Sequence, residues 1–146
     1  MGAEKALHIK ALASGVSPSC IVLNVTVSSM KLHGGGFAGG GGARPTNEEI
    51  ETENVDAVRA GAASNMRRHV RNLATTSIPV VVSINRFATD TDAEIDAIRD
   101  EALKAGAKEI VLFEGFAKGG KGAADLADAV VEACARHEEA GRPFTP

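Results

Sequence analysis

The 146-residue sequence contains no tryptophan and no tyrosine, so five phenylalanines supply all of its aromatic rings. Any site that stacks a flat ligand on an aromatic side chain must therefore use phenylalanine. The sequence also lacks an apolar run near the length of about 20 residues that crosses a bilayer, and its first ten residues lack the apolar core of a signal peptide. These absences predict a cytoplasmic protein without a membrane partner.

Basic residues are too few for a nucleic-acid-binding surface. The 16 lysines and arginines are outnumbered by 19 acidic residues, which gives a net charge of -3. Proteins that bind nucleic acids carry clustered positive charge, so we expect no nucleic-acid partner. The two cysteines, Cys20 and Cys134, form no CxxC pair, and the histidines have no second ligand at metal-binding spacing. We therefore predict buried, reduced thiols and no metal site.

Apolar periodicity predicts an α/β fold. Three short apolar runs indicate strands at residues 20–27, 79–85 and 109–114, and the first two are continuous enough to be buried on both faces. Amphipathic patterns indicate helices at residues 2–13, 46–73 and 92–105, and another that begins after residues 116–123. The alternation predicts one three-layer α/β domain over residues 1–146, with a parallel sheet and flanking helices in a partial P-loop-NTPase-like or Rossmann-like unit.

Two features of this pattern predict that the chain is part of a larger protein or associates with another segment or copy. A helix precedes the first strand, although a crossover helix in a parallel sheet normally follows one, which indicates a piece of something larger. A sheet of three strands also leaves an unpaired edge, so we expect self-association or a missing covering segment.

Glycine is concentrated in residues 33–47, which we predict to be a flexible loop. Gly34, Gly36 and Gly39 have the GxGxxG spacing of dinucleotide-binding sites, but that motif requires the glycines directly between a strand and a helix. Here SSMKLH precedes the tract and ARPTN follows it, so a surface loop is the stronger interpretation. Lys31 and His33 remain a weaker candidate for an anion site at the end of the first strand.

Candidate binding residues follow the second strand. Asn85 ends that strand, and Phe87, Thr89 and Asp90 come next, before a helix whose start carries Thr91 and Glu94 in capping-box spacing. Open α/β sheets bind ligands at the carboxyl ends of their strands. Several alternatives stay open: Thr89 and Asp90 also suit a turn and helix cap, Asn85 could simply hold the strand end, and the phenylalanine could be a core ring.

A second candidate region follows the third strand, in FAKGGKGAADLA at residues 116–127. Lys118, Gly119 and Gly120 lead into a helix there, and the backbone N–H groups of such a helix start can hold an anion. The sequence GxxxxGK[ST] of a Walker A loop is absent.

Four stretches, in this order and spacing, resemble formate-tetrahydrofolate ligase, also called formyltetrahydrofolate synthetase: GAEK at 2–5, TVSSMKLHGG at 26–35, INRFATDTDAEI at 84–95 and FAKGGKGAADLA at 116–127. The resemblance extends from Gly2 to about Ala135. It implies one extra residue around residues 62–65 in the long helix. Because the family's enzymes are much longer, the resemblance also implies that the chain is an internal segment.

The resemblance implies an ATP-dependent ligation in which formate becomes formyl phosphate and tetrahydrofolate then attacks it, giving 10-formyltetrahydrofolate. In the family the folate ring lies between two aromatic side chains, which match Phe87 and Phe116, the second being usually tryptophan. The family uses ATP and Mg, but its P-loop matches nothing in this chain and belongs to sequence upstream of Met1. The chain alone is therefore expected to be inactive, with tetrahydrofolate, a further copy or an upstream P-loop-containing segment as partners.

Two other functions remain as hypotheses. The chain could be a stand-alone pterin- or nucleotide-binding module without catalysis. A dinucleotide oxidoreductase depends on the GxGxxG spacing alone and is the weakest of the three.

Overall fold

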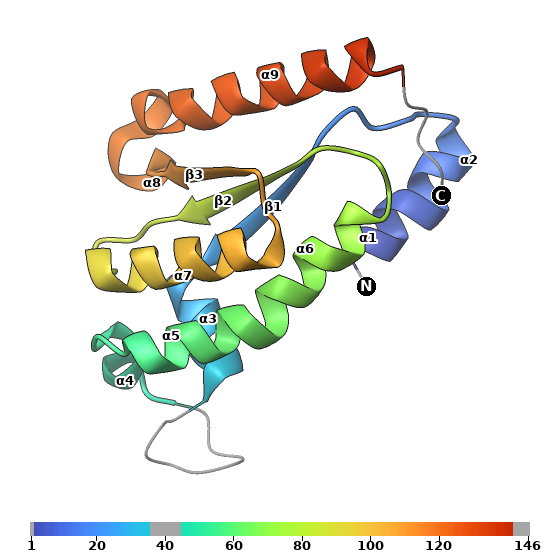
Figure 1. The fold of residues 1–146 in the computed structure, drawn as a ribbon. Coiled ribbons are helices and arrows are strands. Elements are labelled where there is room, and N and C mark those ends of the chain that lie inside the picture. Colours follow the sequence, from blue (N-terminus) through green and yellow to red (C-terminus); the bar gives the residue numbers. More distant parts are fainter. Residues whose placement is uncertain (1, 36–44, 142–146) are drawn as a thin grey trace.

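The computed structural model describes residues 2–35 and 45–141, which form a parallel sheet between two layers of helices (Figure 1). The strands lie in the order β1-β2-β3, with bounds β1 (Ile21–Thr26), β2 (Val80–Asn85) and β3 (Glu109–Phe113). One face carries α9 (Ala124–Glu139), and the other carries α5 (Val55–Gly61), α6 (Arg67–Ala74) and α7 (Asp92–Ala105) (Figure 1). The predicted three-layer α/β architecture is confirmed.

The central strand is the best-buried part of the sheet. In β2, four consecutive residues, 81–84, are buried, because β1 and β3 both pair with it and helices cover both faces. The prediction that the first strand is equally buried is wrong, since Val22 in β1 is 43% exposed. β1 is an edge strand, and α9 packs against β2 and β3 instead. The unpaired edge expected from the sequence is thus present.

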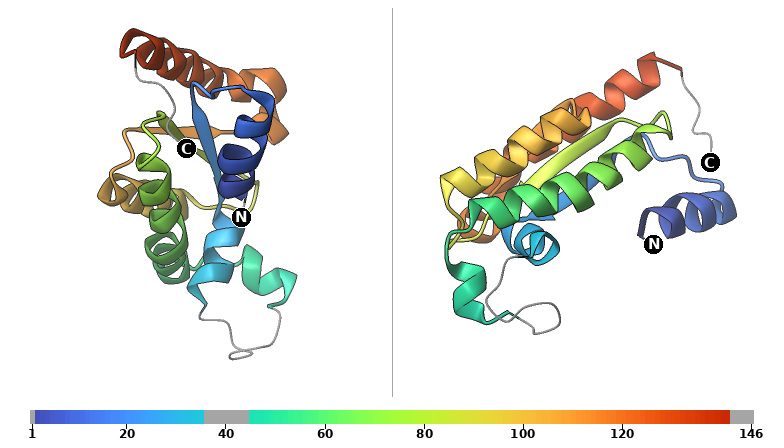
Figure 2. Two further views of the ribbon diagram at one scale, coloured as in Figure 1. Left: turned by 90° about the vertical axis from the view of Figure 1, so that its right-hand side faces the viewer. Right: turned by 60° about the horizontal axis from the view of Figure 1, so that its bottom comes forward.

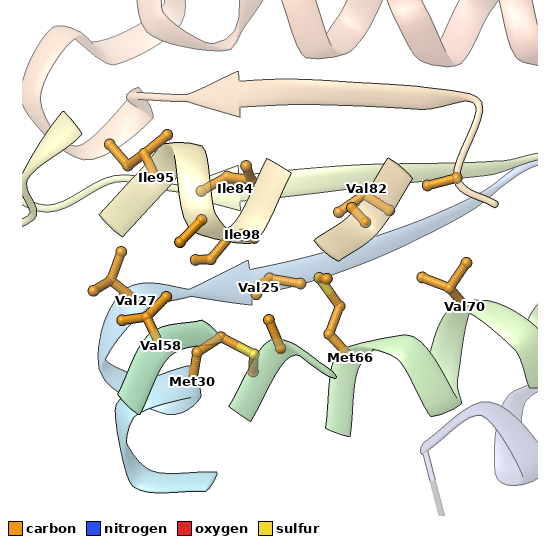
Figure 3. Close-up of a cluster of buried hydrophobic side chains, with 14 residues drawn as sticks. Val25, Val27, Met30, Val58, Met66, Val70, Val82, Ile84, Ile95 and Ile98 are labelled. Atoms are coloured by element: carbon orange, nitrogen blue, oxygen red, sulfur yellow. The ribbon is translucent and has the colours of Figure 1, made fainter. Parts of the chain in front are cut away.

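The main core lies between the sheet and the layer of α5, α6 and α7, as Figure 3 shows. Its buried side chains include Val25, Val27, Met30, Val58, Met66, Val70, Val82, Ile84, Ile95 and Ile98. A smaller cluster lies under α9, where Val81 meets Ala129 and Ala133. Two apolar side chains of the flanking helices lie outside the core: Leu103 of α7 is 59% exposed and Val131 of α9 is 67% exposed. Leu103 lies about 100° around the axis from the buried Ala102, and Val131 lies two residues from each of the buried Ala129 and Ala133, about 200° around the axis of α9.

The N-terminal helix combines α1 (Gly2–Glu4), the π-helical η1 (Lys5–Ala11) and α2 (Leu12–Ser14). Both views in Figure 2 show this helix beside the sheet. The predicted helix is confirmed, and it ends at Gly15, which has the left-handed φ of 68°. Leu7 packs with Leu73 and Ile78, whereas Leu12 is 56% exposed. This helix therefore attaches to the sheet through one main apolar contact.

The long helix predicted at residues 46–73 is two helices. α4 (Asn47–Glu51) ends before Thr52, and a second helix runs through α5, the π-helical η2 (Ala62–Met66) and α6. Asn54 begins the second helix because its side chain accepts a hydrogen bond of 3.0 Å from the Ala57 amide. The capping residue overrides the apolar periodicity.

The π-helical turn η2 covers the residues where the resemblance implies one extra residue. A π turn closes its hydrogen bond over one more residue than an α turn does. The helix can therefore absorb an extra residue there and keep Val58 and Val70 on its buried side.

Two glycines let helices α3 (Val27–Gly34) and α5 cross in close contact. A Cβ atom on Gly34 would lie 1.8 Å from the Ala57 carbonyl oxygen, and one on Gly61 would lie 1.9 Å from that of Met30. Because α3 follows β1 directly, Gly34 ends a helix and does not open one, which removes it from a dinucleotide fingerprint. Residues 36–44 of the predicted loop lie outside the described residues.

Candidate functional site

Phe87 and Phe116 lie together at the carboxyl ends of β2 and β3. Asn85 is paired with Phe113 across the sheet, and the Arg86 amide continues the ladder with a 2.9 Å bond to the Phe113 carbonyl. Phe87 follows at once, and Phe116 lies on the short helix α8 (Gly115–Lys118). The ring centroids are 6.0 Å apart and the planes are inclined by 45°. With exposures of 39% and 83%, neither is a core ring.

The two rings are within the distance of a contacting aromatic pair, so they must open to admit a flat ligand. A heterocycle stacked between two rings needs about 3.4 Å on each side, the spacing of stacked bases, so the ring planes would stand about 7 Å apart. The observed pair, with centroids 6.0 Å apart and planes inclined by 45°, must therefore separate and turn parallel to hold such a ligand. Phe116 has the room to do this, because most of its surface is in solvent.

Asp90 fixes the backbone on which Phe87 stands. The Phe87 amide donates to Asp90 Oδ2 at 2.8 Å, and the Asp90 amide donates back to the Phe87 carbonyl at 3.1 Å. Burial raises the pKa of Asp90 above its usual value, while the bond from the Phe87 amide acts in the opposite direction. Asp90 therefore closes the turn, whereas Thr89 beside it is exposed. Their predicted roles in lining a ligand site stay predictions.

A buried ion pair, Lys31 with Glu94, lies beside this turn. Glu94 Oε1 accepts from Lys31 Nζ at 2.7 Å and from the Asn54 amide at 2.8 Å, and its side chain completes the capping box with Thr91. Burial would raise the pKa of Glu94, but the hydrogen bond from Lys31 and the two backbone amides hold it below its ordinary value. The pair thus links the start of α7 to α3 and α5.

Lys31 has no proton left for an anion. Besides Glu94, its ammonium donates to the carbonyls of Ile50 at 2.7 Å and Thr52 at 2.9 Å. The interpretation of Lys31 as part of an anion site is therefore wrong. Sequence analysis missed the ion pair because its partners are far apart in the chain and each sits in a pattern with a local explanation. The available signal was the charged Lys31 between the apolar Met30 and Leu32.

The glycine-rich segment after β3 forms α8 and the 3-10 turn η3 (Gly119–Ala123), and then leads into α9. Lys118 forms an ion pair with Glu114, whose amide donates to the Gly122 carbonyl at 3.0 Å. No side chain caps the first turn of α9 in the described structure. The anion-binding role of Lys118, Gly119 and Gly120 stays a prediction.

The segment GFAKGGKG at residues 115–122 differs from a Walker A loop at its last position only, where Gly122 replaces Ser or Thr. A Cβ atom on Gly122 would lie 2.4 Å from the Glu114 carbonyl oxygen. The backbone therefore leaves no room for the side chain whose hydroxyl would bind Mg²⁺. This loop does not fit a P-loop.

Asn85 carries an unused acceptor at the end of β2. Its Oδ1 atom is buried and has no hydrogen-bond partner among the described residues. An unpaired buried acceptor costs about 1–3 kcal/mol, so a donor supplied by a ligand would be favourable there.

Within residues 2–35 and 45–141, no helix is long and apolar enough to cross a membrane. The same residues contain no group of three His, Cys, Asp or Glu side chains that could hold a metal ion.

Comparison with known proteins gives this site its context. The family model of formate-tetrahydrofolate ligase matches residues 1–145. The chain belongs to the formate-tetrahydrofolate ligase family. Among its relatives, the formate-tetrahydrofolate ligase of Desulforamulus reducens is 44% identical over 134 residues, which are 92% of this chain and 23% of that protein. The ligase of Paracoccus denitrificans is 43% identical over 146 residues, which are 100% of this chain and 24% of that protein.

A longer relative is the cytoplasmic C-1-tetrahydrofolate synthase of Schizosaccharomyces pombe. It is 46% identical over 134 residues, which are 92% of this chain and 14% of the synthase. The chain thus spans about a quarter of the length of the bacterial family members, and less of the synthase.

Proposed function

We propose that this chain is the folate-binding segment of a formate-tetrahydrofolate ligase, an enzyme that forms 10-formyltetrahydrofolate through formyl phosphate. The observation that carries the proposal is the pair of exposed rings, Phe87 and Phe116, 6.0 Å apart at the carboxyl ends of adjacent parallel strands. Ligands of α/β proteins bind at this edge of the sheet. Family membership supplies a flat, bicyclic substrate that suits two rings.

In this proposal the rings stack on the pterin from both sides. Stacking of a base on an aromatic side chain contributes about 1–3 kcal/mol, and we expect each ring to contribute a similar amount. The free Oδ1 of Asn85 accepts a hydrogen bond from an N–H group of the substrate. Lys118 and the Gly120 amide bind an anionic group at the rim, after Lys118 exchanges its partner Glu114 for the substrate. The Gly119 amide already donates to the Gly115 carbonyl, so Gly119 contributes only its backbone conformation, with a φ of 60°.

The phosphate chemistry is assigned to another part of the enzyme. The loop at residues 115–122 resembles a Walker A sequence but has no room for a Ser or Thr side chain at position 122. In this proposal the chain therefore does not bind the ATP phosphates or Mg. The free edge of β1 is the proposed contact with a further segment, since unpaired edges attract another strand. Analytical ultracentrifugation tests the alternative of self-association, and a monomer at high concentration would count against it.

The test is calorimetric titration of the chain with tetrahydrofolate. We expect Phe87→Ala and Phe116→Ala each to weaken binding about 5- to 150-fold, the equivalent of about 1–3 kcal/mol. Leu103→Ala on the exposed side of α7 is the matched control and should leave the affinity unchanged. Phe116→Trp should strengthen binding, because indole adds contact area and an N–H donor. Equal affinities for all variants would remove the ring slot.

The same titration separates the segment from the stand-alone binding module. The structure alone does not distinguish the ligase segment from the independent module, because Phe87 and Phe116 form their pair within this chain. Strong binding by the chain alone would support a module that works independently. Binding that requires the remainder of the ligase would support the segment.

A further inference from the structure

A row of polar side chains crosses the carboxyl-end edge of the sheet beside the ring pair. Thr26 of β1, Asn85 of β2 and Phe113 of β3 are neighbours in register, and paired strands lie about 4.8 Å apart. Successive side chains of a strand point to opposite faces, and the preceding residues Val25 and Ile84 fill the main core. Thr26 and Asn85 therefore point to the other face of the sheet, where α9 lies (Figure 1).

Asn85 brings an acceptor to this row. Its Oδ1 atom is buried and has no hydrogen-bond partner in the described part of the chain. Phe87 follows two residues later, so the Cα atoms of the two residues are at most about 7 Å apart. A flat ligand held against the Phe87 ring can therefore bring its edge to this acceptor.

Thr26 brings a donor. The hydroxyl oxygens of Thr26 and Ser28 are 3.2 Å apart, and the Ser29 amide donates to Thr26 Oγ1 at 3.1 Å. When Ser28 is the donor of the hydroxyl pair, both lone pairs of the Thr26 hydroxyl are occupied and only its proton remains. Within residues 2–35 and 45–141 that proton has no acceptor other than Ser28, and the half-buried side chain leaves it open to a ligand.

We propose that Thr26 and Asn85 select a heterocycle with a lactam edge, in which a ring N–H group stands next to a ring carbonyl. The N–H group donates to Asn85 Oδ1, and the carbonyl accepts the proton of the Thr26 hydroxyl, which Ser28 holds in the donating orientation. This selection rests on the folate site proposed above, because the pterin of tetrahydrofolate carries such an edge.

The rings and the polar row contribute different properties. Stacking on an aromatic ring accepts any flat heterocycle, since every one has a π face. A site built to hydrogen-bond a polar group rejects an analogue without that group, because the polar atoms of the site are left unpaired. The ring pair thus supplies affinity, and Thr26 with Asn85 supplies the choice of ligand and its orientation.

Fluorescence titration of the full chain with two pteridines tests the proposal. 2-Amino-4-oxopteridine has the lactam edge, and its N3-methyl derivative keeps the carbonyl but has no N–H group there. We expect the parent to bind the first about tenfold more tightly, the ratio that one hydrogen bond of about 1.4 kcal/mol supplies. Asn85→Leu should bind the two pteridines equally, since it removes the acceptor that distinguishes them.

Thr26→Val should weaken the binding of both pteridines about tenfold, because both contain the carbonyl. Since Thr26 also caps α3, Thr26→Ser is the matched variant: it restores the hydroxyl and the cap and should recover the affinity. A parent that binds both pteridines equally, with binding that still depends on Phe87, would overturn this proposal and leave the ring site standing. Binding that Phe87→Ala leaves unchanged would overturn both.

Discussion

The two rings of the candidate site are held in different ways. Phe87 stands on a turn closed by Asp90, and this turn leads into the capping box of Glu94, which is fully buried against Lys31. Phe116 stands on the four-residue helix α8, followed by a glycine-rich turn, and residues 116–121 are all exposed. The turn that carries Phe87 is therefore part of the core, and we call it the fixed wall of the site. The segment that carries Phe116 lies on the surface, and we call it the yielding wall.

This difference suggests how the site would admit a ligand. A fixed wall lowers the entropy lost on binding, because its ring is already in place. A yielding wall can move and turn, so that the tilted pair opens into two parallel planes around a ligand. The movement is thus expected at Phe116, with Phe87 as the reference point.

The largest expected effect comes from breaking the support of the fixed wall. Glu94→Ala leaves the Lys31 ammonium buried without its carboxylate, so we expect a loss of about 3–5 kcal/mol in the free energy of unfolding, measured with urea. Asp96→Ala is the matched control on the same helix, because the Asp96–Arg99 pair is exposed and should contribute less than about 1 kcal/mol. Equal losses would show that the buried pair does not support this wall.

The same pair predicts a pH dependence. The pKa of Glu94 is lowered in the folded protein, so its ionisation stabilises the fold above the unfolded-state value of about 4.3. That contribution is lost as pH falls through the lower, folded-state pKa. The stability of the parent should therefore decline more steeply in acid than that of Glu94→Ala, as measured by urea midpoints at several pH values. Parallel profiles would contradict this assignment.

A smaller effect is expected on the yielding wall. Gly122→Ala places a Cβ atom 2.4 Å from the Glu114 carbonyl oxygen, whereas Gly120→Ala meets nothing within 4 Å. We expect Gly122→Ala to cost about 1–3 kcal/mol, or to displace α8 and weaken folate binding, and Gly120→Ala to stay within about 0.5 kcal/mol of the parent. Urea unfolding and tetrahydrofolate titration measure the two effects. If the two variants behave alike, the segment is too loose for this contact to matter.

The features that the sequence predicts well are those decided by neighbouring residues. The capping boxes at Thr46 and Thr91 depend on bonds within one turn, and the structure has both. The left-handed glycines Gly15 and Gly106 end helices as expected, because glycine pays no Cβ penalty there. The continuous apolar run of β2 matches its burial, although a similar run in β1 does not.

The features that the sequence misses depend on residues distant in the chain. The exposure of Val22 follows from the strand order, which the composition of β1 does not encode. The break between α4 and α5 combines the local cap at Asn54 with a distant contact, since Lys31 donates hydrogen bonds to the carbonyls of Ile50 and Thr52. For the site, the positions of Phe87 and Phe116 just after two strands predict that both lie at the carboxyl-end edge of the sheet. The 45° angle between their rings cannot be predicted in this way, because it depends on how α8 is placed.

The smallest expected effect asks whether the fixed wall needs a charge or only an acceptor. The pKa of Asp90 is raised by burial, so the stability that this group contributes falls as pH rises from its unfolded value of about 3.9 through the folded value. Asp90→Asn keeps an oxygen for the Phe87 amide and removes the buried charge, so near pH 7 it should equal the parent or exceed it by up to about 1 kcal/mol.

Urea unfolding of Asp90→Ala supplies the contrast, because alanine loses the acceptor and should cost about 1–2 kcal/mol. The difference between the parent and Asp90→Asn should shrink in acid, where the parent carboxyl is also neutral. If Asp90→Asn were as damaging as Asp90→Ala, the negative charge would be required, and the nearby Lys31 and Arg86 would be the cations that it serves. The turn under Phe87 would then be held by electrostatic attraction, and the fixed wall would loosen with added salt.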